Sequence, residues 1–463
     1  MKELNGPSRS RRLAPSTRLS LAVVAGLVAF AASGLSQTIQ EPPFYAVRNA
    51  HISLGNGQVI EQGTIVLEKG LITAVGADIE VPDHAWVIEG DGLHAYPGLI
   101  DAMTSLGLDP PPPADTRRSN GGANDTPYST GAEDRPGTFT WRSAADQLDG
   151  DDERIASWRS AGFTSAVTAH QEGIFPGQAS LINLGEGPGE SLVVATPIAF
   201  PIRLEAPGGY RGYPGSLMGV IAYVKQVFAD AEYYSRAWEA YGRDARGRTR
   251  PQYDRTLEPL VRAMNDKTPV WIPAVWKKEI ARALALGETI GSRVVVYGAH
   301  DAYQMADALA DADASVLLSA KWPEADADAN PDAEVPLREL RLRHNAPTTP
   351  KALADAGVRF AFYSDGTKSG KHLLDNVKKS IERGLDEQMA VQALSLNAAE
   401  ILGLSDRLGS LEAGKIGNVL VTQGGLFDEA MTIHSVFVDG RQFRPEPPAE
   451  DPTETRPSEE ARR

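Results

Sequence analysis

The sequence predicts a mixed α/β protein, a (β/α)8 TIM-like barrel with a small β-sandwich domain that both chain ends build. Apolar strand-like runs alternate with helical stretches over roughly 300 residues, which is typical of a parallel α/β barrel. Short strand patterns, separated by turn residues, occur both before and after this region. We therefore expect a barrel over residues 97–408 and a composite sheet domain made of residues 44–96 and 409–443.

The strand pattern before the barrel consists of four short runs. Gly55-Asn56-Gly57 and Pro82-Asp83 separate them, and these residue types adopt the backbone angles that turns require. We expect a small antiparallel sheet here, which two strands after Gly409 complete. The expected strands are 45–47, 64–67, 72–75, 86–89, 418–422 and 432–438.

The central region predicts the strands and helices of the barrel. A long irregular segment, residues 109–153, follows the first expected barrel strand, and loops of this length are usually functional or mobile. Further strands are expected at 165–168, 270–273, 294–297, 315–318 and 360–363. The clearest helices are expected at 216–241, 278–286, 302–310 and 386–394.

The first 37 residues have the pattern of a secretory signal peptide. Basic residues precede an apolar run from Leu19 to Ala32, and small residues follow it. The run is short for a membrane span, which needs about 20 residues, so we expect export to the periplasm or beyond without a stable membrane anchor. An uncleaved anchor is the alternative. The other end of the chain, residues 444–463, is rich in Pro and Glu and is expected to be disordered.

Composition excludes several classes of function. The formal net charge of -15 disfavours a nucleic-acid partner, because a phosphate backbone requires a basic face. The chain has no cysteine, so disulfides, thiolate zinc sites and a cysteine nucleophile are all excluded.

Two segments resemble the amidohydrolases related to imidazolonepropionase. Ala95–Asp101 is similar to the junction that leads into the family's barrel, and Ser395–Lys415 is similar to its final helix and return to the sheet. The resemblance implies a barrel in which a divalent metal activates water to hydrolyse non-peptide C–N bonds. It also implies that imidazole and carboxylate ligands stand at the carboxyl ends of the barrel strands.

Most of the metal ligands that this resemblance implies are replaced. The first strand of the family ends Asp-x-His-x-His, whereas here Met103 and Ser105 follow Asp101 at the two histidine positions. A thioether and a neutral hydroxyl are poor ligands for zinc. The fifth-strand histidine positions hold Pro273 and Val275, and the sixth-strand position falls near Gly298.

Asp365 remains where the family's eighth strand presents a metal-binding aspartate, which makes it the catalytic candidate. A carboxylate held by loop amides or capping a helix is the structural alternative. Other polar residues at or after expected strand ends are candidates for a pocket, and a packed or solvated loop is the alternative for them. They are His170, Glu172, His300, Asp301 and Lys321.

Three hypotheses follow. Residues 96–108, 172–178, 213–216 and 361–365 resemble the metal-poor units that accompany active amidohydrolase units in exported bacterial proteins. The first hypothesis is therefore a pseudoenzyme without a cofactor, which binds a ligand, an active sister subunit or a second copy of itself. The second is a hydrolase with a rebuilt site for one zinc ion on Asp365, His170 and His300. The third is a secreted scaffold without a pocket.

Export predicts a processed N-terminus. The signal-peptide pattern places the cleavage between Ser33 and Gln40. Mass spectrometry of the mature protein should therefore find a new N-terminus in this interval, and a soluble chain that still begins at Met1 would contradict the prediction.

Overall fold

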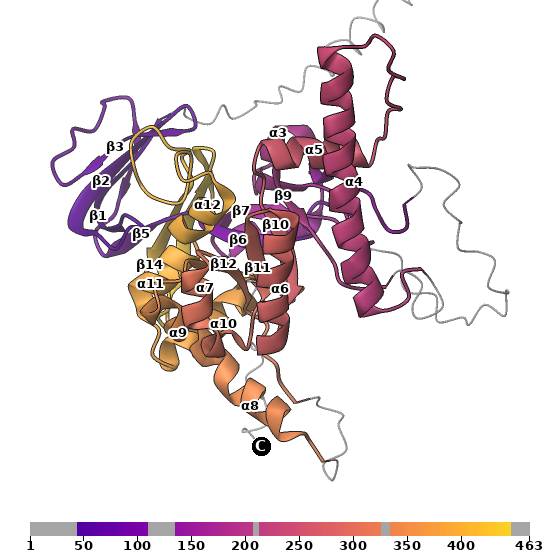
Figure 1. Cartoon of the computed structure of the whole chain (residues 1–463). Coiled ribbons are helices and arrows are strands. Elements are labelled where there is room, and N and C mark those ends of the chain that lie inside the picture. Colours follow the sequence, from indigo (N-terminus) through magenta and orange to yellow (C-terminus); the bar gives the residue numbers. More distant parts are fainter. Residues whose placement is uncertain (1–43, 110–134, 207–212, 326–333, 446–463) are drawn as a thin grey trace, which may run out of the picture. The chain divides into compact units, whose positions relative to one another are not determined.

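The computed structural model describes residues 44–109, 135–206, 213–325 and 334–445. The expected signal peptide, most of the expected disordered tail and a large part of the 109–153 segment lie outside these residues. Two eight-stranded sheets organise the described chain, one at its two ends and one in its centre. Figure 1 shows the first sheet, which we call the composite sheet, beside the central barrel sheet. No helix in the described ranges is long and apolar enough to span a membrane.

The composite sheet joins the first strands of the chain to the last. Strand β14 pairs antiparallel with β5, from Val419 opposite Pro97 to Gln423 opposite Leu93. Its apolar core includes Val47, Ile65 and Phe437, none of which is exposed. Its strands are β1 (Phe44–Ser53), β2 (Val59–Glu68), β3 (Leu71–Gly76), β4 (Trp86–Glu89), β5 (Leu93–Pro97), β14 (Val419–Gln423), β15 (Thr432–Val438) and β16 (Arg441–Phe443).

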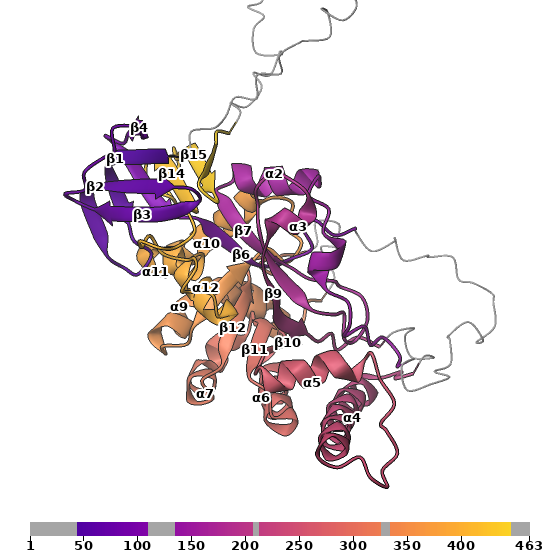
Figure 2. The same ribbon diagram turned by 90° about the horizontal axis from the view of Figure 1, so that it is seen from above.

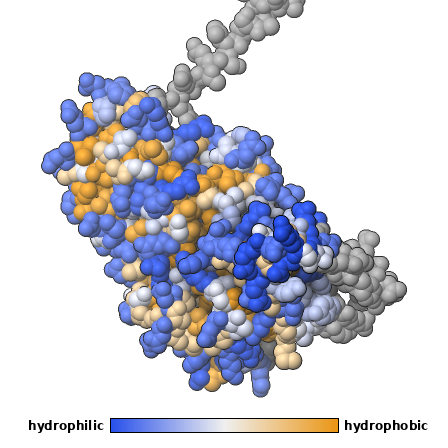
Figure 3. Space-filling view, turned by 45° about the horizontal axis from the view of Figure 1, so that its top comes forward, coloured by the Kyte–Doolittle hydropathy of each residue, from blue (hydrophilic) through white to orange (hydrophobic). Residues whose placement is uncertain are grey.

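The expectation of a purely antiparallel sheet was wrong. Strand β1 pairs in parallel with both β4 and β5, while β2 lies antiparallel on its other side. The reason is topological, because β4 and β5 return to β1 only after the β2–β3 hairpin and a further connection. On the face shown in Figure 3, apolar surface gathers over this sheet. Among its strand residues, Leu71 and Trp86 are 44% and 60% exposed.

The barrel sheet confirms the predicted fold class. Its strand order runs from β6 to β13 without interruption, as a nearly closed eight-stranded barrel. The strands are β6 (Leu99–Thr104), β7 (Phe163–Thr168), β8 (Ala179–Asn183), β9 (Val193–Pro201), β10 (Val270–Ala274), β11 (Val294–Gly298), β12 (Ser315–Ser319) and β13 (Phe360–Tyr363).

One barrel strand departs from the parallel arrangement that the alternating pattern predicts. Strand β8 pairs antiparallel with both β7 and β9. A parallel neighbour requires a crossover of a dozen or more residues, usually a helix. Residues 169–178 before β8 contain no helix, and only the short α3 (Gly189–Leu192) separates β8 from β9. These short connections impose the reversed direction.

Alternating side chains divide the barrel into an inside and an outside. On β13, Ala361 and Tyr363 belong to the interior cluster, whereas Phe360 and Phe362 pack outward against the helices. This is the period of two that a strand imposes. Leu317 on β12 is completely buried inside the barrel, and burial of such a side chain contributes about 1.5–3 kcal/mol.

Helices surround the barrel. The helix expected at 302–310 is interrupted, because a short 3-10 turn at Ala302–Gln304 precedes α7. The long helix α4 lies on the side away from the composite sheet in both views (Figures 1 and 2). The remaining helices are α2 (Glu153–Ser160), α4 (Leu217–Arg243), α5 (Leu257–Asn265), α6 (Lys277–Ile290), α7 (Ala306–Asp311), α8 (Leu337–Asn345), α9 (Thr349–Asp355), α10 (Gly370–Glu382), α11 (Glu387–Ala393) and α12 (Leu396–Leu402).

The junction between the two sheets explains a glycine in the Ala95–Asp101 motif. A Cβ atom on Gly98 would lie 2.1 Å from Oγ1 of Thr164 on β7, so the backbone approaches too closely for any side chain. Gly98 also donates its N–H to the carbonyl of Asn418 at 2.9 Å. The motif therefore brings the two ends of the chain together where the barrel begins.

Removal of the last strands should prevent folding. A fragment of residues 38–405 lacks β14 to β16, so β5 loses its antiparallel partner. The apolar core of the sheet also loses the side chain of Phe437. We predict that this fragment is insoluble, whereas a control fragment of residues 38–445 keeps every strand and stays soluble. Cooperative unfolding of a soluble 38–405 fragment, measured by circular dichroism, would contradict the architecture.

Candidate functional site

A cavity of about 300 Å³ opens at the carboxyl ends of the barrel strands. We call it the mouth cavity. Residues at or after the ends of β6, β7, β9, β11 and β13 line it, together with two side chains of α2. The lining residues are Met103, Thr104, Ser105, Leu106, Arg154, Trp158, Ala169, His170, Gln171, Pro201, Arg203, Tyr297, Tyr363, Ser364, Asp365, Gly366, Thr367 and Lys368.

Beneath this cavity, the carboxylate of Asp101 ties three elements together. It is completely buried on β6. One oxygen accepts a hydrogen bond from the indole N–H of Trp158 at 2.9 Å, and the other accepts from the Ser364 backbone N–H at 3.0 Å. Burial raises the pKa of Asp101 from 3.8 to about 6, against the opposing effect of these donors. The sequence identified Asp101 only as part of a motif, because neither partner is near it in the chain.

Asp365 lies on the rim of the cavity, directly after β13. Its carboxylate accepts a hydrogen bond of 2.8 Å from Oγ of Ser319, at the end of β12. Its backbone φ of 50° lies in the left-handed region, which Asp tolerates better than most residues. The side chain is exposed and therefore accessible to a ligand or a metal ion.

Two buried polar atoms of the cavity wall have no hydrogen-bond partner among the residues that the structure describes. Five such side-chain atoms occur in the described residues, and two of them, Nε2 of His170 and Oγ1 of Thr367, belong to this one cavity. Buried polar groups are normally satisfied, because an unmade hydrogen bond costs about 1–3 kcal/mol. Their presence in one cavity indicates a site that is completed by a bound molecule.

The imidazole of His170 can accept a hydrogen bond at Nε2. Burial, followed by the charge of Arg142, lowers the pKa of its imidazole and favours the neutral form. A ring N–H is hydrogen-bonded to the Ser143 backbone, which leaves the unpartnered Nε2 of a neutral ring as the acceptor.

Cationic side chains stand at the same rim. Lys368 is exposed and forms no ion pair with any carboxylate of the described residues. Arg203 pairs with Glu205 at 2.7 Å, and that glutamate side chain is 75% exposed. Arg154 is occupied differently, because it bonds Asp152 and the carbonyl of Leu108. Sequence patterns did not indicate Lys368 and Arg203, because both lie in loops without periodicity.

Two tyrosines fill the centre of the mouth. Tyr297 on β11 and Tyr363 on β13 meet edge to face, with ring centroids 6.5 Å apart. The hydroxyl of Tyr297 donates to the carbonyl of Ile202 at 3.0 Å. Burial raises the pKa of both phenols, so both remain neutral at physiological pH. Large aromatic rings therefore occupy space at strand ends six and eight.

The replaced ligand positions fall into two groups. Met103 and Ser105 line the mouth cavity, whereas Pro273, Val275 and Gly298 do not. Gly298 has a φ of 94°, a conformation in which any side chain would be strained. The sixth strand therefore differs from a ligand-bearing strand in its backbone as well as in its residue type.

The other pocket candidates lie outside the cavity. His300 is buried, and its Nε2 is 3.2 Å from the carbonyl of Ser319. Asp301 accepts the backbone N–H of Lys277 at 2.9 Å and so caps the start of α6. Glu172 is half exposed, 4.0 Å from Arg142, and Lys321 is an exposed loop residue.

The donor set does not fit a catalytic metal ion. A zinc site uses three or more protein ligands, and the described residues contain no group of three or more His, Asp and Glu side chains that could hold one. Asp365 and His170 share the mouth cavity, but His300 does not reach it. The two orphaned atoms are a hydroxyl and a single imidazole, which suit an organic ligand better.

Comparison with known proteins places these features in a family context. Residues 279–443 match the model of the amidohydrolase family. The adenine deaminase of Moorella thermoacetica (strain ATCC 39073 / JCM 9320) is 34% identical over 114 residues, which are 23% of this chain and 18% of that protein. The chain thus matches less than a fifth of that enzyme's length.

Solved structures share the fold. An amidohydrolase from Thermotoga maritima MSB8 superposes with a TM-score of 0.71 and 22% identity, over 86% of this chain and 100% of that one. An Xaa-Pro dipeptidase with bound methionine in its active site gives a TM-score of 0.51 and 15% identity, over 87% and 100% of the two chains. At these identities the likeness is one of fold.

The buried carboxylate makes stability depend on pH in a defined direction. Because the pKa of Asp101 is raised from 3.8 to about 6 on folding, its contribution is most favourable below 3.8 and is lost as pH rises through 6. Relative to Asp101→Asn, the wild type should lose about 3 kcal/mol of unfolding free energy between pH 3.5 and pH 8, from a shift of about two pKa units.

Chemical denaturation of both proteins across this pH range measures the difference. Asp307→Asn, which removes an exposed carboxylate on α7, controls for the general loss of a charge. If the unfolding free energy of the wild type relative to Asp101→Asn stays constant or rises with pH, the pKa of Asp101 is not raised by burial.

Proposed function

We propose that this chain is an exported pseudoenzyme of the amidohydrolase superfamily, whose family model matches residues 279–443. It binds a small polar ligand in the mouth cavity and does not hydrolyse C–N bonds through a metal ion. The observation that carries the proposal is the pair of unpartnered polar atoms, on His170 and Thr367, in a cavity whose metal-ligand positions hold Met103 and Ser105.

The loss of metal chemistry follows from the donors. The metal would have supplied an activated water, and the chain's own residues that remain near that place are one exposed carboxylate and one neutral imidazole. Loss of a partner that merely orients a ligand weakens metal affinity about 10–100-fold, so loss of several direct ligands weakens it much more. Tyr297 and Tyr363 contribute neutral phenols to the wall of the same cavity.

The cavity wall suggests the chemistry of the ligand. Nε2 of neutral His170 accepts a hydrogen bond, and Oγ1 of Thr367 can donate or accept one. Lys368 and Arg203 offer positive charge at the rim. We infer a small molecule with a negatively charged group and an N–H or O–H donor, because a cavity of about 300 Å³ is at the small end of ligand pockets.

A partner is part of the proposal. The resemblance to metal-poor units that accompany active amidohydrolases supports an active sister subunit or a second copy of this chain as the partner. Recovery of an amidohydrolase with intact metal-binding histidines, by pull-down from the native host, would support the first of these.

The alternative is a hydrolase with a rebuilt site for one zinc ion on Asp365, His170 and His300. Asp365 and His170 line one cavity, which favours it. The Nε2 of His300 lies instead against the Ser319 carbonyl, which weighs against it.

Metal content and turnover test the proposal together. We predict less than stoichiometric zinc, manganese or iron in protein purified without chelators, and no hydrolysis of dipeptides, lactams or N-acyl amino acids. Asp365→Asn should change the unfolding free energy by about 1 kcal/mol or less, because it alters one part-buried hydrogen bond whose acceptor side chain is exposed, and Asp307→Asn is its matched control. About one metal ion per chain, together with turnover that Asp365→Asn abolishes, would contradict the proposal and make His170 and His300 the next residues to vary.

A further inference from the structure

Helices α4 and α5 and the segment between them, residues 244–256, form an arm on the side of the barrel away from the composite sheet (Figure 2). Residues 233–255 contain six arginines and three carboxylates, which makes this stretch positive in a chain whose net charge is -15. Figure 3 shows a strongly hydrophilic area where this end of the arm comes forward. The arm therefore differs in charge from the rest of the chain. None of its residues lines the mouth cavity.

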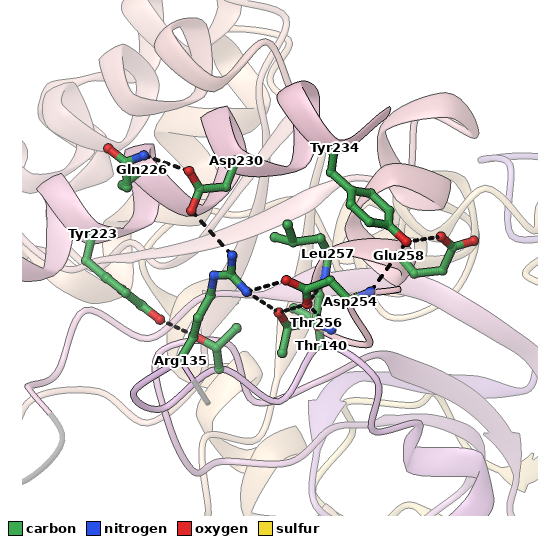
Figure 4. A network of polar contacts seen from close by, with 11 residues as sticks. Arg135, Thr140, Tyr223, Gln226, Asp230, Tyr234, Asp254, Thr256, Leu257 and Glu258 are labelled. Atoms are coloured by element: carbon green, nitrogen blue, oxygen red, sulfur yellow. Dashed lines mark hydrogen bonds and ion pairs between the residues drawn. The ribbon is translucent and has the colours of Figure 1, made fainter. Parts of the chain in front are cut away.

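A hub of polar contacts makes the base of the arm rigid. The guanidinium of Arg135 donates to Asp254 at 2.7 Å and to Oγ1 of Thr256 at 2.8 Å, and it lies 3.5 Å from Asp230 on α4 (Figure 4). The Asp254 side chain is only 6% exposed, so this pair is largely protected from solvent screening. The hub fixes the segment after α4 against the helix.

Two hollows run along the arm and share part of their walls. One has a volume of about 480 Å³ and the other of about 450 Å³, and both are lined by Tyr233, Ala237, Thr249 and Pro251. Together they form one groove between the second half of α4 and residues 248–254, which we call the arm groove. Its walls carry two prominent tyrosines, Tyr233 and Tyr253, whose side chains are 71% and 59% exposed.

The groove has positive charge that its own carboxylates do not balance. Arg236, Arg248 and Arg250 line it and are exposed. Of these, Arg236 has a carboxylate nearby, Glu232 at 3.9 Å. The two carboxylates that line the groove, Asp230 and Asp254, already accept from Arg135. An incoming anion would therefore meet arginines without strong competition from within the groove.

From these features we infer that the arm groove is a docking site for an acidic peptide segment of a partner protein. Tyr and Arg are the residue types that concentrate binding energy at protein interfaces, since both offer large area and directional donors. Arginine also binds carboxylates bidentately. A groove with small alanines at its floor and tyrosines at its edges admits an extended chain, whose Glu and Asp side chains can reach Arg248 and Arg250.

Charge argues against other anionic partners. A nucleic acid or an anionic membrane presents a dense and extended negative surface, which a chain with a net charge of -15 would repel. A peptide touches only the groove, and beyond about 8 Å physiological salt screens the rest of the protein. The chemistry therefore favours an acidic peptide.

Fluorescence anisotropy of a labelled peptide, Glu-Glu-Asp-Pro-Glu-Glu-Asp-Glu, tests the inference on the full-length mature chain. The peptide should bind, and its counterpart with Gln and Asn in place of Glu and Asp should bind at least about tenfold more weakly. Arg248→Glu with Arg250→Glu should weaken the acidic peptide by about tenfold or more, because attraction becomes repulsion.

Lys278→Glu with Arg282→Glu on α6 is the matched control, since it makes the same change of charge outside the groove on exposed positions. It should alter the affinity less than about twofold at physiological salt. Thermal unfolding of each variant verifies that the fold is retained. Equal binding to the groove variant and the control, or tighter binding of anionic phospholipid vesicles or single-stranded DNA than of the peptide, would overturn the inference.

Discussion

The buried carboxylate of Asp101 is the constraint on which the barrel mouth depends. It stands at the seam between the first and last barrel strands, where it joins β6 to the backbone of Ser364 after β13 and to Trp158 on α2. Met103 and Ser105 follow it on one side of the seam, and Asp365 follows Ser364 on the other. The candidate residues on these two strands therefore adjoin one desolvated carboxylate, whose pKa burial raises to about 6.

The proposed function separates the fold of this protein from the metal chemistry that the resemblance implies. The chain keeps the family's junction, with Gly98 packed against Thr164, and its composite sheet. Such a junction and sheet establish the fold, but they do not establish an activity. In the mouth cavity, Met103 and Ser105 stand at two positions where the resemblance implies metal ligands, and the rings of Tyr297 and Tyr363 line the same cavity. What remains is a small cavity with unsatisfied polar atoms and cationic side chains, which suits recognition of a polar molecule.

Sequence patterns predicted the frame better than the mouth. Apolar runs indicated most of the barrel strands, but β8 and β9 were missed, because short apolar runs and the prolines at 197 and 201 give ambiguous strand signals. Asp365 could be found because it belongs to a motif. Thr367, Lys368 and Arg203 could not, since loop residues have no periodicity and their meeting depends on contacts between distant strands. The same holds for the bond between Asp101 and Trp158.

The central claim is that the mouth cavity recognises a polar molecule and has lost its metal site. Crystals grown with excess zinc, measured on both sides of the zinc absorption edge, test this at the level of individual atoms. The account predicts no anomalous peak within coordination distance of Asp365, with Nε2 of His170 contacting solvent or an organic ligand. A fully occupied zinc ion coordinated by Asp365 and His170 would contradict it.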